Sequence, residues 1–222
     1  MRPLQLVVVR HGVTDWNREG RFQGHLDPPL ADLGLEQAAL VGRRLAEQHD
    51  VRPERIVSSS LSRAMETAAA IGAAMGIEVE GDARLIEIGQ GEWEGRTHAE
   101  LEVVDARRYR EWRAASGVRQ PPGGEPIAAA RARIAELVEE LQDAAQGTVC
   151  LVSHGGSLRI LAQHLLELPS GRSWALDVDN ASVGVLTRVE SRWRLDRWND
   201  TGHLLGGSPT HVDESEGQPL AL

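Results

Sequence analysis

Two histidine motifs stand directly after apolar, β-branched segments of this chain. Arg10-His11-Gly12 follows the apolar residues 6–9, and Ser153-His154-Gly155-Gly156 follows residues 148–152. Apolar runs of this kind predict buried strands, and open α/β sheets carry their chemistry beyond the carboxyl ends of strands. One strand-end histidine is more often structural than catalytic. The repeated pattern of strand, histidine and glycine favours a functional site that both motifs share.

Arg63 is the third feature that indicates chemistry. It falls in the first turn of a helix predicted over residues 60–74, with Ser60 as the N-cap and Gly76 as the C-terminal stop. An arginine in that turn opposes the helix dipole, which favours anions there, and an anion bound at the same helix end would explain it. Two guanidiniums and two imidazoles around one point suit a tetrahedral oxyanion, most simply phosphate, because arginine forks match phosphate oxygens.

A zinc site is the alternative interpretation of the two histidines. Zinc sites in proteins use three or four ligands, and the sequence offers no clear third ligand beside the two motifs. The neighbouring arginines would also repel a cation. We therefore expect an oxyanion site without a metal.

The chemistry requires elements that bring these motifs together. Strands alternate with helices along the chain, which predicts a three-layer α/β/α sandwich around a mostly parallel sheet. Gly- and Pro-rich residues 13–29 are expected to form a loop over the sheet edge, and Pro126 is expected to begin a long helix. The predicted strands are 6–9, 55–58, 77–79, 148–152 and a hairpin of 183–189 with 193–198. The predicted helices are 32–48, 60–74, 97–113, 126–146 and 158–168.

The composition limits the possible partners. A net charge of −9 gives no support for sequence-independent binding of nucleic acid, which needs clustered Lys and Arg. Cys150 is the one cysteine of the chain and excludes an intrachain disulfide. No apolar segment approaches the length needed to cross a bilayer, so we expect a cytoplasmic protein with no membrane partner. Residues 203–222 have little to bury and are expected to form a flexible C-terminal tail.

The chain resembles the histidine phosphatase superfamily, also called phosphoglycerate mutase-like, over nearly its whole length. The resemblance implies the phosphoglycerate mutase-like fold, with residues 1–202 as the phosphatase domain and residues 96–125 as a cap-like insertion. The matching segments, in the expected order, are Arg10-His11-Gly12 with Trp16-Asn17, Ser59-Ser60 with Arg63, Glu87 with Gly91-Glu92-Trp93-Glu94-Gly95, and Ser153-His154-Gly155-Gly156.

The resemblance implies roles for individual residues. His11 would be the nucleophile that forms a phosphohistidine, and Glu87 would protonate the leaving alkoxide. Without the resemblance, Glu87 would be interpreted as a charge at a helix N-terminus or a salt-bridge partner. No metal or cofactor is needed, because cationic side chains supply the positive charge. The groups expected to hold the phosphoryl oxygens are Arg10, Arg63, His154, Asn17 and the backbone N–H of Gly155.

The same site serves hydrolases and mutases. Residues 91–95 are similar to the phosphatase branch, so we expect a phosphomonoesterase acting on a small-molecule phosphate ester. A cofactor-dependent phosphoglycerate mutase and a non-catalytic phospholigand-binding module are the alternatives. Residues 91–101 and 193–199 resemble a glucosyl-3-phosphoglycerate phosphatase subfamily, which implies that substrate. The sequence leaves the oligomeric state open, with a homodimer as one option.

The substrate pocket is expected to include Gln23 and Gly24. Arg107 and Arg108, within the basic run 107–113, would bind a substrate carboxylate if their helix caps the pocket, with Tyr109 or Trp112 against a sugar face. The alternative for this run is a solvated helix face laced with salt bridges, which is the more common role of such a segment.

Overall fold

The computed structural model describes residues 3–48, 51–114, 120–144, 147–169 and 175–205. A six-stranded sheet with the order β3-β2-β4-β1-β5-β6 forms its centre. The first four strands in the chain run parallel, and the last two form an antiparallel hairpin at one edge. The strands are β1 (Gln5–Arg10), β2 (Arg55–Ser59), β3 (Val79–Asp82), β4 (Thr148–Ser153), β5 (Val183–Val189) and β6 (Arg192–Asp200).

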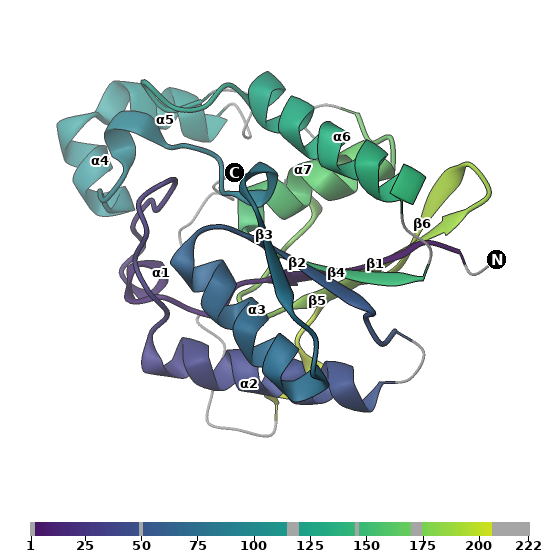
Figure 1. Ribbon diagram of the computed structural model, residues 1–222. Coiled ribbons are helices and arrows are strands. Elements are labelled where there is room, and N and C mark those ends of the chain that lie inside the picture. Colours follow the sequence, from purple (N-terminus) through teal and green to yellow (C-terminus); the bar gives the residue numbers. More distant parts are fainter. Residues whose placement is uncertain (1–2, 49–50, 115–119, 145–146, 170–174, 206–222) are drawn as a thin grey trace.

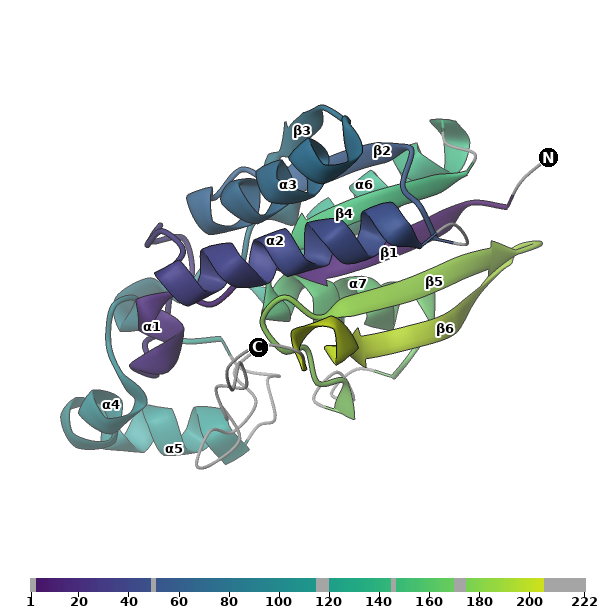
Figure 2. The ribbon, with the colours of Figure 1, turned by 90° about the horizontal axis from the view of Figure 1, so that it is seen from below.

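Helices cover both faces of the sheet (Figures 1 and 2). Helices α2 (Asp32–Glu47) and α3 (Ser62–Met75) lie on one face, and α6 (Ile127–Ala144) and α7 (Gly155–Leu165) lie on the other. β1 is buried from both sides: Leu6 and Val8 pack into the cluster with α6 and α7, whereas the residues between and after them pack into the cluster with α2 and α3. Burial of each such aliphatic side chain favours the folded state by roughly 1.5–3 kcal/mol relative to leaving it exposed to water. The predicted three-layer α/β/α sandwich is confirmed.

The carboxyl ends of the parallel strands face α1 (Asp15–Arg18), α4 (His98–Val104) and α5 (Ala106–Ala114), which are grouped at one end of the molecule (Figure 2). We call residues 96–114 the cap segment; it is the described first part of the predicted insertion, of which residues 115–119 lie outside the description. Leu101, Tyr109 and Trp112 of this segment pack with Phe22 and Trp93 in a separate hydrophobic cluster, which we call the aromatic core.

The aromatic core corrects one expectation. Tyr109 and Trp112 are 0% and 4% exposed, and their rings stack 5.8 Å apart between the two cap helices and Trp93. Neither ring is an exposed wall for a sugar. Residues 97–113 also form two helices, because the chain leaves helical geometry at Asp105, whose carboxylate accepts a hydrogen bond from the Trp93 indole at 2.9 Å.

Helix α3 begins two residues later than predicted, so Ser60 is not its N-cap. The N-cap position is Leu61, which has no capping side chain. Asp27 replaces it: this carboxylate accepts from the backbone N–H of Ser62 at 2.8 Å and from its hydroxyl at 2.7 Å. A distant loop therefore caps the helix, which local sequence does not reveal. Gly76 ends α3 with a φ of 70°, as predicted for a left-handed C-cap.

Helix α7 begins three residues earlier than predicted. His154 is its N-cap residue, and the carbonyl of His154 accepts from the Leu158 N–H at 2.9 Å. The second histidine motif therefore forms the junction between β4 and α7. The N–H groups of its two glycines lie at the start of a helix, where anions are favoured.

The packed chain continues past the predicted boundary at residue 202. Residues Gly202–Leu204 form a 3₁₀ turn against α2, with Leu204 buried. The Nδ1 of His203 accepts a hydrogen bond from Arg44 at 2.8 Å. The rest of the predicted tail, residues 206–222, lies outside the description. No helix of the described residues has the length and apolar character to cross a membrane.

Candidate active site

The register of the sheet brings the two histidine motifs together. Arg10 pairs with Ser153 in the parallel ladder of β1 and β4, so His11 and His154 follow side by side. Their ring centroids are 5.0 Å apart. β2 lies on the other side of β4 and ends in Ser59, whose hydroxyl lies 2.8 Å from Nε2 of His154.

His11 is held as a neutral imidazole with one defined tautomer. Its Nδ1 lies 2.7 Å from the carbonyl oxygen of Gly12, and a carbonyl can only accept, so Nδ1 carries the proton. Nε2 therefore carries the lone pair of the ring. Burial lowers the pKa of His11 well below its ordinary value of 6.5, and the charges of Arg63 and Arg10 lower it further. The ring is therefore neutral near neutral pH, with its Nε2 lone pair unprotonated.

The turn after His11 is fixed by two glycines in contact. A Cβ on Gly12 would lie 2.4 Å from the carbonyl oxygen of Gly34 in α2, and a Cβ on Gly34 would lie 2.1 Å from the carbonyl oxygen of Val13. The N–H of Gly12 also donates to the hydroxyl of Thr67 in α3 at 3.0 Å. The turn after His11 therefore packs on the backbone of α2 with no side chain between them.

His154 presents one ring nitrogen to the site. The Ser59 hydroxyl oxygen accepts from the Leu61 N–H at 3.3 Å, and we assign the hydroxyl proton to the contact with Nε2 of His154. Nδ1 then carries the ring proton; it is buried and has no hydrogen-bond partner among the described residues. A buried donor left unpaired costs about 1–3 kcal/mol, and a phosphoryl oxygen would remove that cost. Burial lowers the pKa of His154 well below 6.5, and Arg63 lowers it further.

Arg63 lies fully buried in the first turn of α3, as predicted. Its Nη1 donates to the carbonyl of Leu26 at 2.9 Å, and its Nη2 donates to the carbonyl of Gly24 at 3.0 Å. Burial lowers the pKa of Arg63 to about 10, although the carboxylates of Glu87 and Asp27 oppose this. The guanidinium is therefore charged at neutral pH and fastens the loop of residues 24–26 to α3.

Arg10 and Gly155 are neighbours across the site. The Nη1 of Arg10 donates to the carbonyl of Val178 at 2.7 Å, and a Cβ on Gly155 would be 3.6 Å from the Arg10 Nε. The start of α7 therefore lies against this guanidinium. We refer to Arg10, His11, Arg63 and His154 as the four-residue cage.

Glu87 lies at the N-terminus of α7. Its Oε2 accepts from the Gly156 N–H at 3.1 Å, and its Oε1 accepts from the N–H groups of Ser157 and Ile88 at 3.1 and 2.9 Å. A charge at a helix N-terminus was the simple alternative for this residue, and the structure shows that arrangement. The helix is the one that begins at His154, so the same contacts fix the Glu87 carboxyl beside the cage.

Asn17 and Gln23 meet at Thr14. The Oδ1 of Asn17 accepts from the backbone N–H and the hydroxyl of Thr14, at 3.1 and 3.0 Å. The Gln23 amide donates to the same hydroxyl at 2.9 Å. Because its oxygen is engaged, Asn17 has its NH₂ group left for donation. Gly24 has a φ of 51° and lies so close to Glu94 that a Cβ would be 2.2 Å from a carboxylate oxygen.

Arg107 and Arg108 lie on the solvent side of α5. Their side chains are 78% and 46% exposed, and they pair with Glu111 at 3.3 Å and Asp105 at 2.7 Å. Tyr109 and Trp112 occupy the buried face of the same helix, which turns the two arginines outward. The structure thus shows the solvated, ion-paired face that the sequence left as the alternative. No described contact joins either arginine to the cage.

Residues 177–181 are a part of the site that the sequence did not indicate. The Asn180 side chain donates to the carbonyl of His11 at 3.1 Å and to that of Gly12 at 3.4 Å. The Ala181 N–H lies 3.1 Å from the carbonyls of both Arg10 and His11, at a φ of 57°. This loop clamps the first motif mainly through backbone atoms, which residue types do not mark. The placement of Asn180 shortly before a strand was the one available signal.

These observations define a class of protein: an α/β sandwich in which two neutral histidines at adjacent strand ends lie within the influence of two arginines, suited to transfer of a phosphoryl group. The chain belongs to the histidine phosphatase superfamily (branch 1), whose family model matches residues 6–201. Within the described residues, no group of three or more His, Cys, Asp and Glu side chains is arranged to hold a metal ion.

Similar proteins named for an enzymatic activity match almost the whole chain. A glucosyl-3-phosphoglycerate phosphatase of Mycobacterium tuberculosis is 38% identical over 92% of this chain and 98% of its own. Phosphoserine phosphatase 1 of Hydrogenobacter thermophilus is 34% identical over 90% and 94%. A mycobacterial glucosyl-3-phosphoglycerate phosphatase solved with VO₃ matches with a TM-score of 0.81 and 39% identity, over 89% of this chain and 99% of that one. The chain is thus a histidine phosphatase, similar to enzymes of small phosphorylated metabolites.

Proposed function

We propose that this protein is a metal-independent phosphomonoesterase that works through a phosphohistidine on His11. The observation that carries the proposal is the neutral His11 ring, with its Nδ1 proton fixed by Gly12 and its centroid 5.0 Å from that of His154. A buried, neutral imidazole that feels the charges of two guanidiniums is suited to act as a nucleophile beside a binding site for its anionic target.

The first half of the reaction forms a bond between His11 and phosphorus. The Nε2 lone pair attacks in line, the ester P–O bond breaks, and the leaving alkoxide takes a proton from the Glu87 carboxyl. Arg10 and Arg63 neutralise the charge on the equatorial oxygens, and the Nδ1–H of His154 donates to one of them. The Asn17 NH₂ group and the Gly155 N–H are further donors in this proposal.

The second half returns the enzyme to its starting state. Water attacks phosphorus and gives its proton to the Glu87 carboxylate, the P–N bond breaks, and phosphate leaves. His11 is released with its lone pair restored and its Nδ1 proton unchanged. Because side chains of this protein supply the positive charge that stabilises the phosphoryl oxygens, neither step requires a metal ion.

Metal independence gives a direct prediction. Phosphate release from p-nitrophenyl phosphate at mildly acidic pH should be unchanged in excess EDTA, and vanadate should inhibit it because its oxygens occupy the cage. The measurement is the rate of p-nitrophenol formation after dialysis against chelator. Loss of turnover in EDTA that added zinc or magnesium restores would contradict the mechanism, and no hydrolysis at all would favour the non-catalytic phospholigand-binding module.

For the substrate, we propose glucosyl-3-phosphoglycerate. Support comes from the 38% identity to the mycobacterial enzyme of that name. We expect kcat/KM for this ester to exceed that for phosphoserine, 3-phosphoglycerate and p-nitrophenyl phosphate by about tenfold or more. Phosphate release across the panel checks this, and comparable rates would contradict the assignment. Formation of 2-phosphoglycerate from 3-phosphoglycerate with a bisphosphorylated primer would favour the mutase alternative.

We propose a cytoplasmic location, supported by the single, fully buried Cys150 and the absence of any second cysteine in the sequence. Burial raises the pKa of the Cys150 thiol to about 12, so it is an unreactive core residue. A homodimer is one option for the oligomeric state, and light scattering on the purified chain tests it. The net charge of −9 supports the absence of a nucleic-acid partner.

A further inference from the structure

Glu87 stands on a segment without helix or strand, between the 3₁₀ turns Ala83–Leu85 and Gly91–Trp93. Its side chain is fixed by the start of α7, but its backbone needs separate support. The carbonyl oxygen of Glu87 accepts from two side chains outside the cage: Nε2 of His25 at 3.0 Å and Nη2 of Arg133 at 3.3 Å. Neither has a role in the reaction proposed above.

Arg133 extends from α6 to both sides of the proton donor. Its Nη1 donates to the carbonyl of Arg84 at 2.6 Å, so one guanidinium spans the backbone from Arg84 to Glu87. Its Nε and Nη2 donate to the two carboxylate oxygens of Glu125 at 2.8 and 3.0 Å. The side chains of the pair are 14% and 15% exposed.

Glu125 holds the far end of the same segment. Its Oε2 accepts from the Gly89 N–H at 3.3 Å, and its own backbone N–H donates to the Gly89 carbonyl at 2.8 Å. The ion pair is therefore joined to the backbone at residues 84, 87 and 89. A largely buried ion pair contributes little net stability compared with apolar residues of the same size, and its contacts here are with the segment that carries one functional carboxyl.

We propose that Arg133 and Glu125 are positioning residues for the proton donor: their ion pair holds the backbone of residues 84–89 so that the Glu87 carboxyl meets the leaving oxygen. This rests on the proposed function, in which Glu87 supplies that proton. Arg133 and Glu125 act through Glu87 and touch neither phosphate nor nucleophile. The chemical consequence is selective, because loss of the proton donor matters for a strongly basic leaving alkoxide and little for p-nitrophenolate.

The test compares two esters of similar size. For Arg133→Gln and Glu125→Gln, kcat/KM for 2-phenylethyl phosphate should fall about tenfold or more, within the range that a general acid contributes, whereas kcat/KM for p-nitrophenyl phosphate should stay within about twofold. Phosphorylation of His11 from p-nitrophenyl phosphate should also persist. Glu87→Gln is the reference and should show the same selectivity more strongly.

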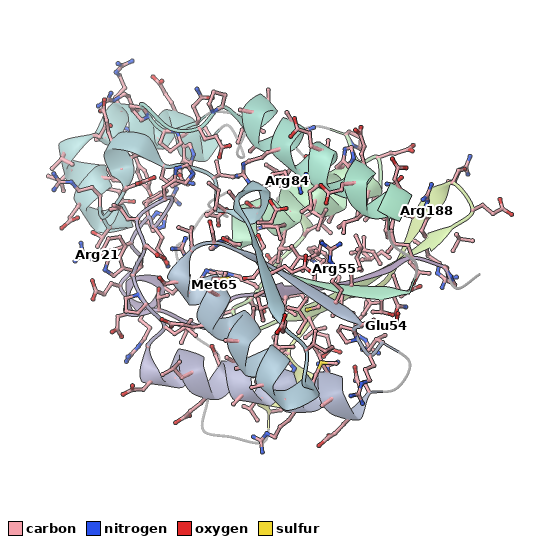
Figure 3. The ribbon with its side chains drawn as sticks, viewed as in Figure 1. Arg21, Glu54, Arg55, Met65, Arg84 and Arg188 are labelled. Atoms are coloured by element: carbon pink, nitrogen blue, oxygen red, sulfur yellow. The ribbon has the colours of Figure 1, made fainter. Side chains whose placement is uncertain are left out.

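Arg84→Gln is the matched control. Arg84 lies on the same segment, near α6 in Figure 3, and ion-pairs with Asp82 and Glu140 at 2.6 and 2.8 Å, but its side chain makes no described contact with Glu87. It should leave both esters unaffected. If Arg133→Gln fails to fold, Arg133→Lys retains the charge without the fork and should show the same selective loss.

The results distinguish failure of the positioning role of Arg133 and Glu125 from failure of the proton-donor role of Glu87. Parallel losses on both esters in the Arg133 and Glu125 variants, or no loss on either, would overturn the positioning role while a selective Glu87→Gln leaves the proposed function intact. If Glu87→Gln itself shows no selectivity between the two esters, the proton-donor role in the proposed function fails first.

Discussion

His11→Ala should lower phosphate release by at least about 10⁴-fold, the scale on which loss of a nucleophile acts, and should abolish labelling of the protein by phosphorylated substrate. The structure provides one neutral imidazole with its Nδ1 proton fixed and its Nε2 lone pair beside two guanidiniums. The neighbouring His154 has its Nε2 engaged by Ser59 and cannot replace it. Rapid quenching followed by intact-mass measurement detects the acid-labile phosphohistidine.

His164→Ala is the control for His11→Ala. His164 is exposed on α7, outside the cage, so the variant should keep both turnover and the phosphorylated species. His154→Ala should retain the nucleophile while weakening its electrostatic support, so phosphorylation should become slow but detectable. Near-normal turnover of His11→Ala would overturn the assignment of the nucleophile and with it the covalent mechanism.

The protein should lose stability as the pH falls below 6.5, a range in which the titration of carboxylates contributes little to the change. Burial lowers the pKa of His11 and His154 well below 6.5, whereas in the unfolded chain both return to that ordinary value. Between these values the unfolded chain binds more protons, so stability is lost as the pH falls below 6.5. Each fully titrating histidine contributes a slope of about 1.4 kcal/mol per pH unit, so the pair contributes about 3.

Urea unfolding in phosphate-free buffer at pH 7.5, 6.0 and 5.0 measures this loss. His203 adds to it: its burial lowers its pKa to about 4, which sets the lower limit of its part of the window. The effect of Asp200, whose hydrogen bond from Arg44 lowers its pKa to about 2, comes at more acidic pH. A free energy of unfolding that stays constant from pH 7.5 to 5.0 would contradict the buried, neutral state of the two histidines.

The cage could be predicted because its residues violate ordinary local preferences. His11 and His154 directly follow apolar strands, and Arg63 lies at the helix end that repels cations. What the sequence does not contain is the register, which makes Arg10 the partner of Ser153 and so sets the histidines side by side. Sequential order alone leaves that spacing undetermined.

There is a physical reason why the supporting residues could not be predicted from the sequence. Asn180, Arg133 and Glu125 act on carbonyl and amide groups of distant segments, and every residue except proline offers the same backbone groups. Arg107 and Arg108 show the opposite case. In the sequence, a cluster of like charges can suggest a binding site. In the structure, the cluster faces solvent because Tyr109 and Trp112 occupy the buried face of the same helix.

The contact between Gly12 and Gly34 bears on when the turn after His11 becomes ordered: during folding or during each catalytic cycle. With no side chain between the turn and α2, the backbone that carries the proposed nucleophile packs directly against the helix backbone, as tightly as a protein interior. The conformational entropy of that turn is lost once, when the chain folds, and is not lost again in each catalytic cycle. Substrate therefore binds beside an imidazole that is already oriented, and the reorganisation required for reaction is mainly that of the substrate and its water.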